Sequence, residues 1–168
     1  NKKNINKNLI FVSNKMGVPK NSLILMRQTH SNKVVEIKKN NYKKKIKADA
    51  MITKMKGIAL GVVTADCVPI ILYDVKNHII GCIHAGWKGA YKGIIKKVIS
   101  FMLKKGCSNN SIKAAIGPCI QQNSYNVGAE FKKKFIKKNK KNKIFFKKKK
   151  KELYFNLPSF VKFQLKLN

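Results

Sequence analysis

The sequence predicts an α+β fold, with a mixed β-sheet core and flanking helices. The centre of the chain holds short apolar runs rich in β-branched residues, each bounded by Gly, Pro, Asp or Asn, which is typical of buried strands. One later segment repeats its apolar residues at helical spacing. Strands and helices are mixed without strict alternation, which favours α+β over a doubly wound fold.

The N-terminal part is predicted to begin with a polar, lysine-rich lead into one helix. This helix is expected near Asn8–Met16, and Gly17 and Pro19 would end it. Two strands and a basic loop are then expected, over Leu23–Arg27, Val34–Ile37 and Lys38–Lys47.

The centre is predicted to supply the strands of a well-buried sheet, over Met51–Thr53, Ile58–Val63, Val68–Tyr73 and Ile79–Ile83. The clearest helix follows, with Gly106 as its natural stop. Its apolar stripe consists of Ile94, Ile95, Val98, Ile99, Met102 and Leu103. A further strand is expected over Ile112–Ile116.

Lysine dominates the segment from Lys132 to Lys151, where thirteen of twenty residues are lysine. Burying unpaired ammonium groups is costly, so we expect a solvated helix and loop that contributes little to the core. Phe131, Phe135 and Ile136 would give that helix one apolar edge. A strand and the start of a helix are expected afterwards, over Leu153–Phe155 and Phe160–Leu165.

Length and charge limit the classes of function. A chain of 168 residues suits a single domain, residues 1–168. The net charge is +32, but Arg27 is the only arginine, so the charge fits compositional drift and solubility better than specific nucleic-acid recognition. No apolar run is long enough to span a membrane, and Leu9–Val12 is too short for the core of a signal peptide. We expect a cytoplasmic protein without membrane or specific nucleic-acid partners.

Cysteine and histidine carry the predicted chemistry. The four cysteines form no C-x-x-C pair and are expected to be reduced thiols: Cys67, Cys82, Cys107 and Cys119. Of the three histidines, His78 is expected in a surface turn, and His30 directly follows a strand. Cys67 lies in a polar Thr-Ala-Asp-Cys interruption between two apolar strands. Thiolate and imidazole suit zinc or copper, and three ligands would leave a fourth position open.

His84 lies where a strand is expected to end and a helix to begin. Gly86 and Gly89 suggest a tight turn with room for a ligand, and the helix start offers free N–H groups for an anion such as phosphate. From the residues alone, either a metal site or purely structural roles for these side chains are compatible with the sequence.

Five short blocks, taken in order, resemble the signature of the YfiH-like family, the laccase-domain purine nucleoside phosphorylases. The older family labels are multicopper polyphenol oxidase and peptidoglycan editing factor. The blocks are Arg27-Gln28-Thr29-His30, Ala48-Asp49-Ala50-Met51-Ile52-Thr53, Thr64-Ala65-Asp66-Cys67-Val68-Pro69, His84-Ala85-Gly86-Trp87-Lys88-Gly89 and Ile116-Gly117-Pro118-Cys119-Ile120.

The resemblance implies a metal centre with His30, Cys67 and His84 as ligands, holding Zn²⁺ or Cu²⁺. It also implies phosphorolysis of adenosine, inosine and methylthioadenosine to free base and ribose 1-phosphate, with phosphate as co-substrate, and adenosine deaminase activity. Gly86 and Lys88 would then contribute to phosphate binding. Oligomeric state is left open.

The chain departs from the family pattern in three places. Lys88 replaces an arginine, and Asn126 replaces a glutamate after Tyr125. Family members also begin earlier and continue further, so we expect a fragment or reduced version whose metal cleft is open on one side. The zinc deaminase pattern of H-x-E with P-C-x-x-C is absent from the sequence, so deamination would need another acid–base group, Asp49 or Asp66.

Three other functions compete with this prediction. A cysteine hydrolase would use Cys67 as nucleophile and His84 as base. A copper-dependent polyphenol oxidase is disfavoured, because multicopper oxidation needs many histidines and the chain has three. A nucleic-acid binder would need aromatic residues interleaved with basic ones on strands, whereas the aromatic residues here fall mostly in apolar runs.

Overall fold

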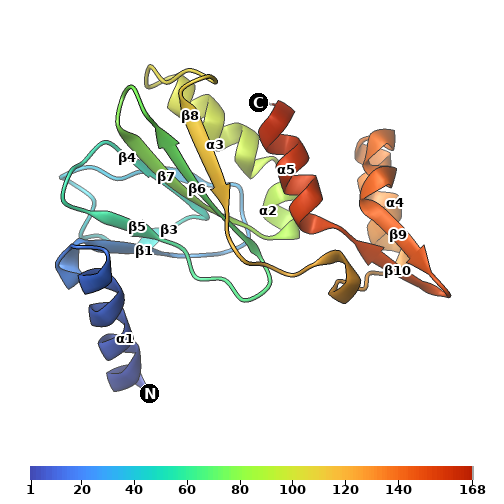
Figure 1. The fold of residues 1–168 in the computed structure, drawn as a ribbon, viewed down its shortest axis with the longest axis horizontal. Coiled ribbons are helices and arrows are strands. Elements are labelled where there is room, and N and C mark those ends of the chain that lie inside the picture. Colours follow the sequence, from blue (N-terminus) through green and yellow to red (C-terminus); the bar gives the residue numbers. More distant parts are fainter. Residues whose placement is uncertain (168) are drawn as a thin grey trace.

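A five-stranded mixed sheet forms the centre of the structure, a computed structural model that describes residues 1–167 (Figure 1). Its strands lie in the order β2-β4-β7-β6-β8. β2 and β4 are parallel, and the other neighbours are antiparallel. The bounds are β2 Val34–Glu36, β4 Ala50–Thr53, β7 Ile79–Ala85, β6 Val68–Asp74 and β8 Ile112–Ile116. The α+β prediction with a mixed sheet is confirmed.

A second, three-stranded parallel sheet carries the start of the chain, in the order β3-β1-β5. Its strands are β3 Ile46–Lys47, β1 Leu23–Arg27 and β5 Ala59–Gly61. Two expectations are corrected here. The end of the predicted basic loop is a strand, because Ile46 is buried and pairs with Met26 of β1. The run Ile58–Val63 yields the shorter β5, which belongs to this sheet and not to the central one.

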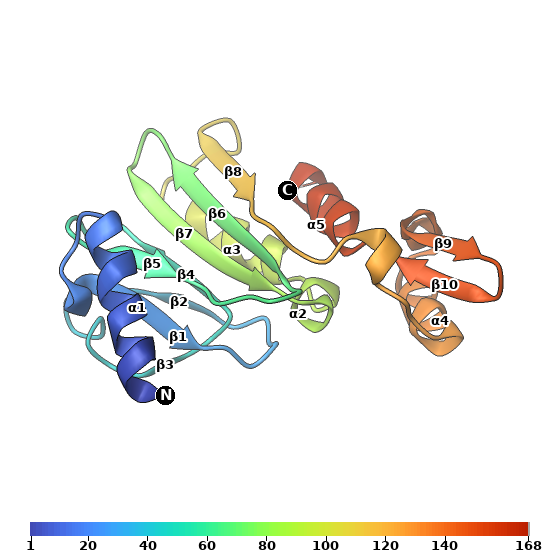
Figure 2. The same ribbon diagram turned by 60° about the horizontal axis from the view of Figure 1, so that its bottom comes forward.

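The first helix, α1 (Lys2–Lys15), extends away from the sheets in Figure 1 and comes in front of them in the turned view of Figure 2. Ser13 is its buried residue. The helix begins six residues before the expected start at Asn8. Asn1 explains the difference, because its side-chain oxygen accepts a hydrogen bond from the backbone N–H of Lys3 at 3.0 Å and caps the helix. The lysine-rich lead is therefore helical.

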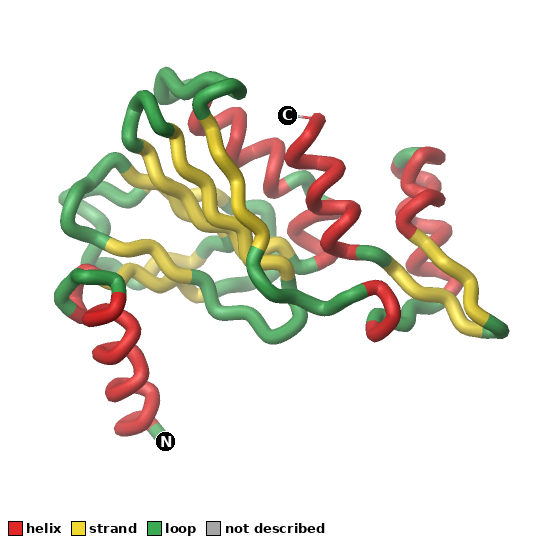
Figure 3. The backbone as a smooth tube through the Cα atoms, viewed as in Figure 1, coloured by secondary structure: helices red, strands yellow, loops and turns green. Residues whose placement is uncertain are grey.

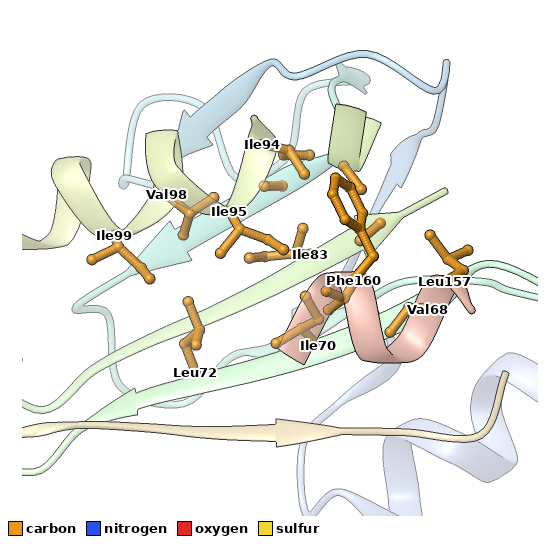
Figure 4. Packing of buried hydrophobic residues seen from close by; sticks show 14 of the residues in the cluster. Val68, Ile70, Leu72, Ile83, Ile94, Ile95, Val98, Ile99, Leu157 and Phe160 are labelled. Carbon is orange, nitrogen blue, oxygen red and sulfur yellow. The ribbon is translucent and has the colours of Figure 1, made fainter. Parts of the chain in front are cut away.

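Three helices cover one face of the central sheet: α2 Trp87–Tyr91, α3 Ile94–Leu103 and α5 Leu157–Leu167. The helix predicted from the apolar stripe is confirmed as α3. Figure 4 shows the resulting core, in which alternate residues of β6 meet the apolar face of α3 and the start of α5. These residues are Val68, Ile70 and Leu72 of β6, Ile94, Ile95, Val98 and Ile99 of α3, and Leu157 and Phe160 of α5.

The helix expected at Phe160 begins at Leu157 instead. Asn156 explains this, since its Oδ1 accepts a hydrogen bond from the N–H of Ser159 at 3.0 Å. Pro158 fits the first turn of a helix, where a backbone N–H would have no partner within the helix.

No helix among residues 1–167 is both long and apolar enough to cross a membrane.

The lysine-rich segment forms a separate group of elements at one end of the molecule (Figure 3). It contains α4 Ala129–Lys138, a 3₁₀ helix over Lys140–Phe145, and a hairpin of β9 Phe146–Lys149 with β10 Glu152–Phe155. Twelve of the thirteen lysines are exposed, as predicted. The prediction that the segment contributes little to the core is wrong, because Phe135 is 0% exposed and Phe145 is 5% exposed. Phe135 packs among other phenyl rings while the flexible lysine stems point outward.

Candidate metal centre

Three polar side chains meet at one end of the central sheet. His30 lies in the loop after β1, Cys67 directly precedes β6, and His84 is the last but one residue of β7. Pro69 pairs with His84 across the β6–β7 hairpin, which brings Cys67 near that histidine. The three ligand atoms all lie within 4.8 Å of one another, and the Sγ of Cys67 is 3.8 Å from the Nε2 of His30.

The backbone of His30 lies in the left-handed region, with φ of 55°. This region is unfavourable for a residue with a side chain, so surrounding contacts must hold the turn. Asp49 provides them, because its Oδ1 accepts a hydrogen bond from the N–H of His30 at 2.9 Å. The N–H of Thr29 and that of Ser31 donate to the same carboxylate, at 3.0 and 2.7 Å.

Asp49 also fixes His84. The Nδ1 of His84 lies 2.9 Å from Oδ1 of Asp49, and the backbone N–H of His84 donates to the carbonyl of Asp49 at 2.8 Å. With Nδ1 as the donor, Nε2 is the nitrogen left to bind a ligand. A carboxylate behind a histidine in this way sets the ring orientation and tautomer at many metal sites.

The protonation of Asp49 follows from this environment. Burial raises the pKa of its carboxyl, but hydrogen bonds from Ser31, His84 and the backbone outweigh burial and lower the pKa to about 2. Asp49 therefore stays ionised at neutral pH. Its two oxygens are occupied by these donors, and Asp49 is not among the residues that line the neighbouring pocket, which counts against the expected acid–base role.

Gly86 creates the space in which the three side chains meet. A Cβ at this position would lie 2.8 Å from the Sγ of Cys67 and 3.0 Å from a ring carbon of His30. Gly89 serves a similar purpose, since its Cβ would lie 2.9 Å from the carbonyl oxygen of Ser31. The two glycines of the His-Ala-Gly-Trp-Lys-Gly block thus allow α2 to pack against the His30 loop.

A pocket of about 290 Å³ opens beside His30 and Cys67. Asp66 and Lys88, both predicted site residues, line it. Trp87, for which the sequence left core packing and substrate stacking equally open, lines it too. Three residues that the sequence did not single out for this role complete its walls: Ile120, Tyr125 and Leu157. Burial raises the pKa of Tyr125 to about 12, and the electrostatic influence of the nearby Cys67 and Asp66 adds to this effect. Its hydroxyl is therefore a neutral hydrogen-bonding group at the edge of the site.

The remaining thiols and the third histidine lie outside the metal cluster. Among the described residues all four cysteines are free thiols. Burial raises the pKa of Cys82 to about 12 and that of Cys107 to about 11, so both are inert small side chains in the core. His78 lies in the β6–β7 turn, as predicted, with its Nδ1 2.8 Å from the hydroxyl of Tyr73.

The donor set fits one metal ion. Two imidazoles and a thiol are ligands for zinc or copper. Tetrahedral zinc places ligand atoms roughly 3.3–3.8 Å apart, so the 4.8 Å limit requires only a small contraction. For the expected phosphate contacts, Lys88 is exposed beside this pocket, and Gly86 caps the helix α2, which is five residues long.

The fold and the convergent ligands define an α+β protein with a candidate single-metal centre. The chain belongs to the family described as multi-copper polyphenol oxidoreductase laccase, which matches residues 1–168. A purine nucleoside phosphorylase of Rickettsia conorii is 38% identical over 146 residues, covering 86% of this chain and 60% of that protein. Adenosine deaminase RL5, from an unknown prokaryotic organism, is 38% identical over 130 residues, covering 73% and 50%.

Solved structures agree with the fold. YfiH of Bacillus licheniformis matches with a TM-score of 0.87 and 25% identity, covering 96% of this chain and 64% of that one. A Neisseria meningitidis protein gives a TM-score of 0.87 at 23% identity, covering 99% and 66%. The chain spans about 60% of the length of the purine nucleoside phosphorylase relatives from Rickettsia.

Proposed function

We propose that His30, Cys67 and His84 bind one metal ion, Zn²⁺ or Cu²⁺, and that this centre processes purine nucleosides. One observation carries the proposal: the three ligand atoms lie within 4.8 Å of one another, and the buried Asp49 orients one of the histidines. Such a centre would supply a Lewis acid with an open position for water or substrate.

The pocket beside the ligands suits a purine nucleoside. Trp87 and Tyr125 offer aromatic surfaces, and Ile120 and Leu157 offer apolar ones. Lys88 lies at the same pocket and is exposed, so its ammonium can attract phosphate as a point charge. Relatives named purine nucleoside phosphorylase and adenosine deaminase support this choice of substrate class.

The proposed reactions are phosphorolysis and deamination. In phosphorolysis, phosphate attacks the ribose carbon and the N-glycosidic bond breaks, which gives free base and ribose 1-phosphate. Adenosine, inosine and methylthioadenosine are the proposed substrates. Asp66 is the acid that lines the pocket, so we assign proton transfer to it, while Asp49 acts as a positioning residue behind His84.

The cysteine hydrolase is less well supported. It requires an activated thiolate at Cys67, yet burial together with the negative charges of Asp66 and Asp49 raises the pKa of this thiol. The Nε2 of His30 also lies 3.8 Å from the Cys67 sulfur, within the same cluster, and a hydrolase that uses only Cys67 and His84 gives this third side chain no role.

Elemental analysis and a nucleoside assay of purified protein test the proposal together. We expect about one zinc or copper ion per chain, and release of hypoxanthine from inosine only when phosphate is present. Cys67→Ala should lose both the metal and the phosphate-dependent cleavage. Cys119→Ala removes a comparable half-buried thiol outside the cluster and should keep both.

Two results would contradict the proposal. Retention of metal and activity by Cys67→Ala would exclude the assigned ligand set. Activity that depends on Cys67 but survives complete removal of metal by a chelator would identify a cysteine hydrolase instead.

A further inference from the structure

A second and larger concavity lies apart from the metal pocket. It is an open groove of about 790 Å³ between the loop Asn32–Val34 and the exposed side of α3, and it shares no lining residue with the metal pocket. The two walls are tied together, because Nδ2 of Asn32 donates a hydrogen bond to the carbonyl of Lys92 at 2.8 Å. The groove is thus a defined part of the fold.

Six of the eleven lining residues are lysines: Lys33, Lys92, Lys96, Lys97, Lys104 and Lys138. Lysine and arginine together account for 38 of 168 residues in the whole chain, so the groove is more than twice as rich in cations as the average. No acidic side chain lines it, and the salt bridges found among residues 1–167 involve none of its lysines. An anion in the groove would relieve the mutual repulsion of these charges.

Some of these lysines form a row along α3. Lys96 lies within the helix and Lys104 caps its C-terminal end, eight residues later and about 12 Å further along the helix axis. Lys92 precedes the helix, and Lys33 and Lys138 come from separate elements on the flanks. A row of this kind fits a linear anion with repeated charges better than a single phosphate.

The chemistry of the lining favours bare phosphates over nucleotides. Lysine binds phosphate as a point charge, and arginine, which makes bidentate contacts, is absent from the lining. Single-stranded nucleic acids bind through aromatic platforms as well as charge. Phe101 is the aromatic residue of this groove; it is half-buried and carries the ammonium of Lys105 at 5.8 Å from its ring centre.

From these features we propose that the groove binds linear inorganic polyphosphate. This inference is independent of the metal centre and of nucleoside processing. It concerns a local row of charges, and its test must separate that row from the high charge of the whole chain.

Two variants with equal loss of charge make this separation. In the first, Lys92, Lys96, Lys97 and Lys104 of the groove are replaced by Gln. In the control, Lys147, Lys148, Lys149 and Lys151 of the β9–β10 hairpin are replaced by Gln. All eight side chains are exposed, and the hairpin lies away from α3 (Figure 1). Circular dichroism and thermal melting should show that both variants remain folded.

Binding of a short polyphosphate is measured by calorimetry over a series of salt concentrations. We expect the groove variant to bind at least about tenfold more weakly at about 0.15 M salt. The slope of log K against log salt should fall by about three to four, roughly one per lysine lost. The hairpin variant should bind as the unchanged protein does, with a slope altered by less than about one.

Three outcomes would overturn the proposal. Equal weakening in both variants would mean that total charge, and not the groove, governs binding. Failure of the unchanged protein to bind polyphosphate at about 0.15 M salt would exclude the site. Tighter, groove-dependent binding of oligothymidylate of the same charge would assign the groove to single-stranded nucleic acid instead.

Discussion

Two buried carboxylates, Asp49 and Asp74, lie at opposite ends of the β6–β7 hairpin and are both 0% exposed. Asp74 ends β6 and pairs with Ile79, whereas Asp49 lies next to His84 near the end of β7. β6 has seven residues, so its two ends lie about 20 Å apart. In both cases burial raises the carboxyl pKa, and hydrogen bonds overcome it and lower the pKa to about 2.

The two carboxylates differ in what they hold. Asp74 accepts hydrogen bonds from the N–H of Asn77 at 2.6 Å and from the hydroxyl of Ser111, which closes the hairpin turn and joins it to the start of β8. Asp49 instead holds the His30 turn and the ring of His84. A buried, ionised carboxylate is therefore no sign of function by itself; the groups that it positions decide its role.

Replacement of each carboxylate by an amide should give the largest contrast. Asp49→Asn and Asp74→Asn should both lower the free energy of unfolding by about 1–3 kcal/mol, because an amide cannot accept every bond and leaves buried donors unpaired. Asp49→Asn alone should lower metal affinity by about 10–100-fold, since His84 loses the partner that orients it. Urea unfolding and competition with a chelating dye measure the two effects.

Loss of metal affinity in Asp74→Asn would contradict the view that Asp49 serves the metal site and Asp74 only the hairpin turn. Full metal affinity in Asp49→Asn would show that His84 needs no orienting carboxylate.

Glycine substitutions sharpen the same contrast with a smaller effect. Gly86→Ala would place a Cβ 2.8 Å from the Sγ of Cys67, so crowding should cost about 1–3 kcal/mol and displace two ligands. Gly106 lies near the Asp74 end, with φ of +88° and its carbonyl bonded to Asn77. Gly106→Ala should cost about 1 kcal/mol through backbone strain and leave metal binding unchanged. Thermal melting with and without added zinc distinguishes the two variants. An equal rise in melting temperature on adding zinc to both would contradict the placement of Gly86, and not Gly106, beside the metal ligands.

The sequence identified the positions of the candidate ligands but not the residue that organises them. His30, Cys67 and His84 stand out as polar interruptions at the ends of apolar strands, and the family resemblance selected them. Asp49 sits between two alanines, and nothing local shows that three backbone N–H groups from the His30 turn converge on it. Such convergence depends on the packing of remote segments, so sequence reasoning offered Asp49 as an alternative to Asp66 for proton transfer, a role that the surroundings of Asp49 oppose.

The dependence on remote contacts also explains where the predicted fold was wrong. The helix α3 was predictable because its signal, an apolar stripe, is local. The strand β3 was not, because two residues in a basic stretch become a strand only through pairing with β1. The segment around Phe135 was expected to contribute little to the core because its local composition is dominated by lysine. Lysine stems can point outward around a buried ring, so this local signal was misleading.

The acid stability of the protein isolates Asp74 from the metal site. The pKa of Asp74 is about 2 in the folded protein and lies near 3.8 ordinarily, so the unfolded chain takes up a proton first as the pH falls. The stabilisation from Asp74 is therefore complete above about pH 5 and is lost between about pH 4 and pH 2.

The variant Asp74→Asn tests this, because an Asn side chain binds no proton in that range. The difference in unfolding free energy between the unchanged protein and Asp74→Asn should narrow over this interval. Asp49 titrates similarly in both proteins and cancels from the difference. Urea unfolding of the metal-free proteins from pH 6 to pH 2 measures this difference in unfolding free energy. A difference that stays constant would show that ionisation of Asp74 does not stabilise the folded protein.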